Sequence, residues 1–128
     1  MRGTTMTSRS GRTFHAFLGI PYAQPPVGDL RFKAPEPPGM WPGVLNATAD
    51  GPMCMQKNYM DANPQVQGQE DCLYLNVYTH DVMMVYIHGG GFFSGTGASY
   101  FWVLSTSWTR YCTGHIQLQT RSVGISEY

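Results

Sequence analysis

The most informative segment of the chain is residues 82–92, Val-Met-Met-Val-Tyr-Ile-His-Gly-Gly-Gly-Phe. Residues 82–87 are apolar at every position, which is typical of a strand buried on both faces of a sheet. Three successive glycines after such a strand indicate that the backbone approaches another group closely or adopts a positive φ. A flexible turn also accounts for three glycines, so the surrounding sequence has to separate the two interpretations.

The residues before this segment predict further strands and little helix. The run Cys72–Tyr78 is rich in β-forming residues, and only Thr79-His80-Asp81 joins it to the apolar strand. Residues 1–18 alternate loosely between polar and apolar around Ser10-Gly11-Arg12, which predicts a hairpin with its turn at the glycine. The chain therefore hardly supplies the helices that a sheet buried on both faces requires.

A proline-rich segment follows the hairpin. Residues 19–42 hold seven of the nine prolines, and proline excludes helix interiors and central strands because it lacks the amide donor. Large apolar residues argue against a solvated linker. They are Phe17, Ile20, Tyr22, Leu30, Phe32 and Trp41. We expect ordered coil packed onto a core, followed by a brief strand at residues 44–48.

Composition excludes several functional classes. The 128 residues carry eight Lys plus Arg and eight Asp plus Glu, so there is no basic surplus for nucleic acid. No window approaches the ~20 apolar residues that a membrane span needs, and residues 1–11 lack the apolar run of a signal peptide. Only 12% of residues are charged, with 15 Gly and 9 Pro, which indicates one small, loop-rich piece of a larger protein.

The three cysteines, Cys54, Cys72 and Cys112, cannot all pair with one another. A bond between Cys54 and Cys72 would close the loop that starts near residue 51, with a stabilisation of about 3 kcal/mol. The triplet Asn46-Ala47-Thr48 is an acceptor sequence for N-linked glycans, which matters only in a secreted protein.

Five segments in the same order along residues 2–100 resemble the type-B carboxylesterases, the α/β-hydrolase family that includes cholinesterases and insect esterases. They are FLGIPYA at 17–23, PPVG at 25–28 with LRF at 30–32, Trp41 with Gly43-Val44, EDCLYLNVY at 70–78 and VYIHGGGF at 85–92. The resemblance implies the α/β class. The chain is expected to be the N-terminal portion of an α/β-hydrolase fold, made locally of strands and ordered coil around an incomplete central sheet.

The resemblance also assigns a role to the glycines. Ester hydrolysis develops negative charge on the carbonyl oxygen, and preoriented backbone amides stabilise that charge. In this family the amides come from the glycine loop and from the residue after the nucleophile, so Gly90 and Gly91 are predicted to be the two loop donors. His88 is a candidate base, but beside an all-glycine loop a structural role through a hydrogen bond to the backbone is favoured. No metal or cofactor is expected.

Four further expectations come from the resemblance. Cys54 and Cys72 correspond to the family's first disulfide, and Arg31 and Glu70 to a buried ion pair whose disruption typically costs about 3–5 kcal/mol. The parent protein is then secreted or passes through the secretory pathway. In that compartment Asn46 becomes a glycosylation site.

The chain departs from the family after residue 100. No Gly-x-Ser-x-Gly sequence is present, and residues 101–128 have no clear period. Shifting the reading frame of degenerate codons for residues 111–128 by one base permits IVLVTFNYRLGLLGFLS, the family's next strand and turn. We therefore assign residues 1–100 to the N-terminal part of a carboxylesterase type-B domain and residues 101–128 to a frame-shifted tail.

The predicted parent function is hydrolysis of small-molecule carboxylic esters by a Ser-His-Glu/Asp triad, with neither nucleic acid nor a membrane span involved. This chain, which lacks the nucleophile, is expected to be inactive. A noncatalytic adhesion or binding protein on the same scaffold and a nonfunctional gene product are the alternatives. The residue at the nucleophile position distinguishes an enzyme from a binding protein.

Overall fold

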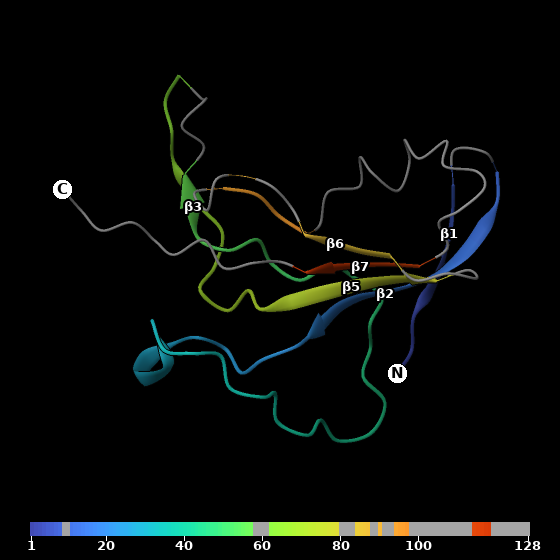
Figure 1. Cartoon of the computed structure of the whole chain (residues 1–128), viewed down its shortest axis with the longest axis horizontal. Helices are drawn as coiled ribbons and strands as arrows, with labels where there is room; N and C mark the ends of the chain where they lie inside the picture. The colour runs from blue at the N-terminus through green and yellow to red at the C-terminus, as the bar shows by residue number, and fades with distance from the viewer. Residues whose placement is uncertain are drawn as a thin grey trace.

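The computed structural model describes residues 1–8, 11–57, 62–79, 84–87, 90, 94–97 and 114–118, with the last strand and residues 84–87 described as backbone only. Its elements are β1 (Thr4–Thr7), β2 (Thr13–Pro21), the 3-10 turn η1 (Gly28–Leu30), β3 (Gln56–Lys57), β4 (Val66–Gln67), β5 (Tyr74–Thr79), β6 (Met84–Ile87) and β7 (Gly114–Leu118). Five strands form one open sheet in the order β1-β2-β5-β7-β6, and β3 and β4 form a separate two-stranded sheet (Figure 1). Within the described part of the chain there is no α-helix. This strand-rich, open architecture agrees with the predicted N-terminal portion of an α/β-hydrolase fold.

The predicted N-terminal hairpin is confirmed. β1 pairs antiparallel with β2, with Thr4 opposite Ala16 and Thr7 opposite Thr13. At its turn Gly11 has φ of 81° and donates its amide to the carbonyl of Ser8 at 2.9 Å. Glycine reaches this positive φ without the steric cost that a Cβ imposes.

A small core lies where β2 pairs with β5. Ala16, Leu18 and Tyr78 are buried there, and Met6 and Phe14 pack against them. The rings of Phe14 and Tyr78 meet edge to face with centroids 6.2 Å apart, which is a favoured aromatic geometry. The alternation along β2 therefore directs one face of the hairpin into this core.

The proline-rich segment is coil, as predicted, with η1 as its only regular turn among the described residues. It leaves the end of β2 and passes along one side of the sheet (Figure 1). Phe32 and Trp41 remain 63% and 40% exposed, so the expectation that they pack onto the core is wrong. The strand expected at residues 44–48 is also absent: Asn46 and Thr48 make only isolated bridges, to Arg2 and Leu18.

The centre of the sheet contains a strand that the sequence analysis did not assign. β7 runs antiparallel to β5, with Val77 opposite Ile116, and parallel to β6, with Val85 opposite Ile116. The one sequence signal for it is the five-residue alternation Gly-His-Ile-Gln-Leu at residues 114–118. The strands β5 and β6 follow one another in the chain, but β7, which comes from residues 101–128, lies between them in the sheet.

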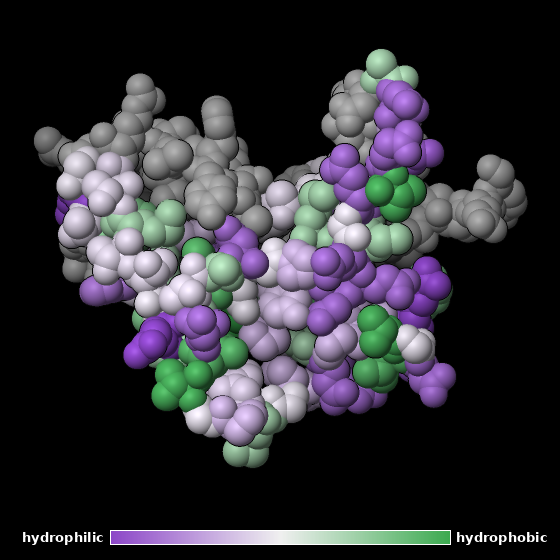
Figure 2. All heavy atoms as spheres, turned by 180° about the vertical axis from the view of Figure 1, so that it is seen from behind, coloured by the Kyte–Doolittle hydropathy of each residue, from purple (hydrophilic) through white to green (hydrophobic). Residues whose placement is uncertain are grey.

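Apolar side chains on the described surface form separate patches among polar ones (Figure 2). The largest exposures belong to residues of the proline-rich coil and its continuation, with Met40 at 101% and Val44 at 71%. Among the described residues, no helix has the length and apolar character to cross a membrane.

Candidate functional site

The glycine loop after β6 is described at Gly90 and then at residues 94–97. Gly90 is exposed and has φ of 138°, a conformation that residues with a side chain rarely adopt. A Cβ built on Gly90 would overlap the carbonyl oxygen of Ser94. The amide of Ser94 donates to the carbonyl of Gly90 at 3.2 Å. This turn therefore requires glycine at position 90, for both its dihedral angle and its close backbone contact.

Two of the predicted site residues lie outside the described residues. His88 and Gly91 belong to this group, so the positioning role of the first and the donor role of the second stay predictions. In the sequence His88 directly follows Ile87, the last residue of β6.

The structure brings a residue to this loop that the sequence analysis missed. The side-chain amide of Gln56 in β3 donates from Nε2 to the carbonyl of Gly95 at 2.7 Å. Its Oε1 accepts the amide of Gly95 at 2.6 Å. The two residues are 39 positions apart, and no motif in the sequence links them.

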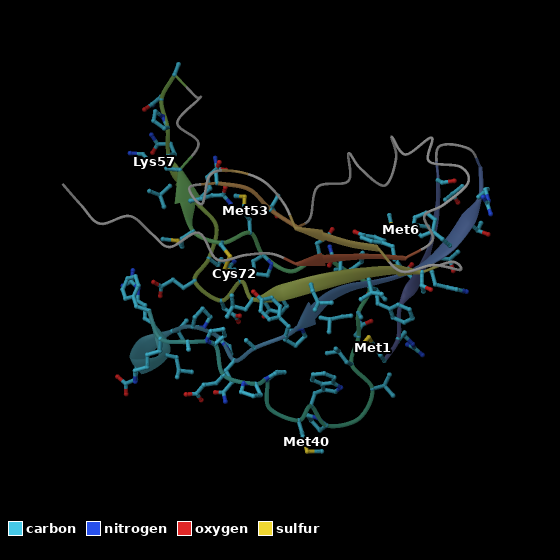
Figure 3. The ribbon with its side chains drawn as sticks, in the orientation of Figure 1. Met1, Met6, Met40, Met53, Lys57 and Cys72 are labelled. Atoms are coloured by element: carbon cyan, nitrogen blue, oxygen red, sulfur yellow. A yellow bond between two sulfur atoms is a disulfide. The ribbon has the colours of Figure 1, made fainter. Side chains whose placement is uncertain are left out.

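Gln56 lies in the loop that the disulfide closes. Cys54 and Cys72 are bonded with their Cα atoms 5.0 Å apart, as the family resemblance implied. Both are buried, at 3% and 2% exposure. Beside them Met55 donates its amide to the carbonyl of Gln69 at 3.1 Å, and Gln69 donates to Met53 at 2.8 Å. Figure 3 shows Cys72 at the base of the projecting β3-β4 hairpin, with Met53 nearby and Lys57 farther out.

The ion pair between Arg31 and Glu70 is present but is not buried. Arg31 Nε lies 2.9 Å from Glu70 Oε1, and the two side chains are 54% and 40% exposed. The guanidinium also lies 5.0 Å from the centre of the Phe32 ring. The expected burial is wrong because the coil carrying Arg31 lies on the outside of the molecule. Solvent screening reduces an exposed pair of this kind to below about 1 kcal/mol.

A buried amide joins β5, the irregularity in β2 where the register shifts between Phe17 and Ile20, and the segment that leads to the cysteine loop. Asn76 is 4% exposed. Its Oδ1 accepts the amide of Gly19 at 2.8 Å, and its Nδ2 donates to Asp50 Oδ1 at 2.6 Å and, more weakly, to the hydroxyl of Tyr78 at 3.4 Å. Asn76 therefore satisfies three groups around the core at once.

Two tyrosines near the disulfide have perturbed acidity. Burial raises the pKa of Tyr22. Burial also raises the pKa of Tyr74, with a further rise from its hydrogen bond to Asp71 and from the charge of that carboxylate. Both phenols stay protonated to a higher pH than an exposed tyrosine does, so each can donate a hydrogen bond over a wider pH range. Across the described ranges, no three His, Cys, Asp or Glu side chains gather as a metal site would need.

The sequon lies on an exposed, backbone-anchored stretch. Asn46 and Thr48 are exposed, and Thr48 Oγ1 donates to Asn46 Oδ1 at 3.2 Å. The residues on either side of Asn46 are held to the N-terminus, since Leu45 accepts the amide of Arg2 at 2.8 Å and Ala47 donates to the carbonyl of Arg2 at 2.7 Å. The Asn46 side chain is thus accessible on a fixed backbone.

Comparison with known proteins gives one family. The sequence model of the carboxylesterase family matches residues 1–102. The chain is 55% identical over 104 residues to the juvenile hormone esterase of Tribolium castaneum, covering 76% of this chain and 18% of that protein. It is 47% identical over 93 residues to the para-nitrobenzyl esterase of Bacillus subtilis (strain 168), covering 66% and 19%. With the cholinesterase of Mus musculus the identity is 46% over 114 residues, covering 77% and 19%. The chain thus spans about a fifth of the length of these curated relatives.

Proposed function

The chain belongs to the carboxylesterase family, and from this premise we propose that it is the N-terminal part of a serine hydrolase of carboxylic esters. The proposal rests on the backbone at Gly90, which has φ of 138° and no room for a Cβ. A position without a side chain, a short distance after β6, suits a backbone segment that approaches a substrate carbonyl.

The proposed chemistry is attack of a serine hydroxyl on the ester carbonyl. A histidine accepts the serine proton, and a Glu or Asp orients that histidine. The carbonyl oxygen becomes negatively charged in the tetrahedral intermediate, and the amides of Gly90 and Gly91 donate to it together with the amide after the serine. Removing one such donor costs about 3–4 kcal/mol in other hydrolases. His88 holds the glycine loop through its backbone rather than acting as the base.

The 128 residues contain no Gly-x-Ser-x-Gly sequence, so we propose that this chain by itself is inactive. An oxyanion site polarises a carbonyl but supplies no attacking group. Purified chain and a Gly90→Ala, Gly91→Ala double variant are expected to hydrolyse p-nitrophenyl butyrate at the same background rate. Turnover above that variant and sensitive to a serine reagent would refute the proposed inactivity.

The division at residue 100 is tested on the transcript. Sequencing through and beyond the codons for residues 97–128 is expected to restore an open frame that encodes NYRLG and then Gly-x-Ser-x-Gly. A clean transcript that stops after Tyr128 contradicts the frame-shifted tail and the ester hydrolase together. A different residue in place of the serine would instead favour a noncatalytic binding protein on the same scaffold.

The proposed substrate class is small-molecule carboxylic esters, with no cofactor and no nucleic acid involved. The loop at residues 54–72 contains no tryptophan, so it offers no indole face to a quaternary ammonium group. Choline esters are therefore disfavoured relative to general esters. The three relatives compared above are named for different esters, which supports the broad class.

We also propose that the parent protein is secreted or passes through the secretory pathway and carries a glycan on Asn46. The buried Cys54–Cys72 disulfide supports an oxidising compartment. The exposed Asn46 side chain, hydrogen-bonded to Thr48, supports modification. Secretion from insect cells followed by glycosidase treatment is expected to lower the apparent mass of the wild type and leave an Asn46→Gln variant unchanged. No shift in the wild type would contradict the glycan.

A further inference from the structure

Both polar atoms of the half-buried Gln56 side chain make hydrogen bonds. Nε2 donates to the carbonyl of Gly95 at 2.7 Å and to the carbonyl of Cys54 at 3.2 Å. Oε1 accepts the amide of Gly95 at 2.6 Å. The primary amide therefore exchanges two hydrogen bonds with one backbone residue, in the way that two residues pair across an antiparallel ladder.

Neighbouring covalent and hydrogen bonds hold Gln56 in place. Gln56 follows Cys54 by two residues, and Cys54 is buried and bonded to Cys72. β3 pairs with β4, with Gln56 opposite Gln67. The hydrogen bond from Gln56 to the carbonyl of Cys54 further limits the side-chain rotamers. A side chain held in this way positions its partner at low entropic cost.

The partner of Gln56, Gly95, lies in the glycine loop. Gly95 has φ of 131°, so the loop backbone there adopts a conformation that favours glycine. Its neighbour Ser94 donates to the carbonyl of Gly90 at 3.2 Å. In a planar trans peptide unit the carbonyl and the next amide point in opposite directions, so a hydrogen bond that orients the carbonyl also orients that amide. Holding Gly95 therefore holds the turn that orients the peptide unit after Gly90.

We propose that Gln56, carried by the disulfide-closed loop, is a positioning residue that holds the oxyanion-binding glycine loop through its paired hydrogen bonds to Gly95. The proposal rests on the proposed ester hydrolase function for its catalytic meaning and on the described contacts for its geometry. Gln56 touches no reacting atom. It acts by keeping the loop amides aimed at the position where charge develops.

The geometric part is tested by amide hydrogen exchange in the 128-residue chain. Gln56→Ala removes both hydrogen bonds to Gly95, and exchange at the Gly95 amide is expected to accelerate by about tenfold or more. The matched control is Gln65→Ala, which removes an exposed amide of the same loop whose hydrogen bond among the described residues is to Asn63 Oδ1, at 3.1 Å. The amide of Leu18, bonded to the carbonyl of Ala47 at 2.9 Å, reports on the sheet. It is expected to keep its protection in both variants.

A conservative variant separates positioning from folding. Gln56→Glu keeps the acceptor for the Gly95 amide but has no donor for the Gly95 carbonyl. Exchange at the Gly95 amide in this variant is therefore expected to be faster than in the wild type and slower than in Gln56→Ala. Unchanged exchange at Gly95 in Gln56→Ala would overturn the proposal. Equal loss of protection at Leu18 and Gly95 in both Gln56 variants would also overturn it, because Gln56 would then support the whole fold.

The catalytic part is tested in the intact hydrolase with p-nitrophenyl butyrate. Gln56→Ala is expected to lower kcat about tenfold and to change KM by less than about twofold, because the loop amides act mainly on the transition state. Gln65→Ala is expected to leave both constants unchanged. An unchanged kcat in Gln56→Ala overturns the positioning role. If the intact wild type shows no turnover that a serine reagent inhibits, the proposed ester hydrolase function is refuted instead. The exchange rate of the Gly95 amide then still tests whether Gln56 holds Gly95.

Discussion

Replacing Asn76 by alanine is expected to destabilise the chain by about 2–3 kcal/mol. The side chain is 4% exposed, so water does not readily replace its partners. Loss of Oδ1 leaves the amide of Gly19 without its acceptor at 2.8 Å, a cost of about 1–2 kcal/mol for a partly buried donor. Loss of Nδ2 removes a hydrogen bond of 2.6 Å to the carboxylate of Asp50. That bond is worth about 1 kcal/mol once partial solvent access to Asp50 is allowed for.

The free energy of unfolding is measured by urea denaturation, followed by tryptophan fluorescence. Asn63→Ala is the matched control, because it removes an exposed amide whose partner among the described residues is the exposed Gln65, and it is expected to change stability by less than about 0.5 kcal/mol. Asn76→Asp keeps an acceptor for Gly19 but sets a second carboxylate against Asp50, so it is expected to be destabilised as well. A loss below about 1 kcal/mol in Asn76→Ala would show that the packing of β2 against β5 does not depend on this amide.

Three other results follow from the same structure. A Cys54→Ala, Cys72→Ala variant is expected to lose about 3 kcal/mol in urea denaturation, because the unfolded chain regains the freedom of the closed loop; equal stability with and without the bond contradicts this. Arg31→Ala is expected to lose less than about 1 kcal/mol because its ion pair is exposed, and a loss near 3 kcal/mol would mean the pair is buried in solution. The raised pKa of Tyr74 stabilises the folded state below about pH 10 and ceases to do so as the pH rises through the folded-state value. The fall in stability at alkaline pH should therefore be shallower in Tyr74→Phe than in the wild type. Identical pH profiles of the two proteins would contradict a raised pKa of Tyr74.

Local patterns in the sequence were sufficient for the elements whose partners lie nearby. The hairpin of β1 and β2 follows from alternation around Gly11, because a tight turn fixes the register of adjacent strands. The coil from residue 22 onward follows from its prolines, which remove the donors that a helix or a central strand needs. The requirement for glycine at position 90 was also readable as a pattern, since a run of glycines after an apolar strand has few structural explanations.

The remaining features depend on residues far apart in the chain. The position of β7 between β5 and β6 is set by pairing across the sheet, which short alternations do not specify. The contact between Gln56 and Gly95 spans 39 positions, and a glutamine in a polar loop carries no signal of its partner. Burial also emerged only in three dimensions: Asn76 lies inside and the Arg31–Glu70 pair outside, because solvent exposure depends on how whole segments pack rather than on residue type.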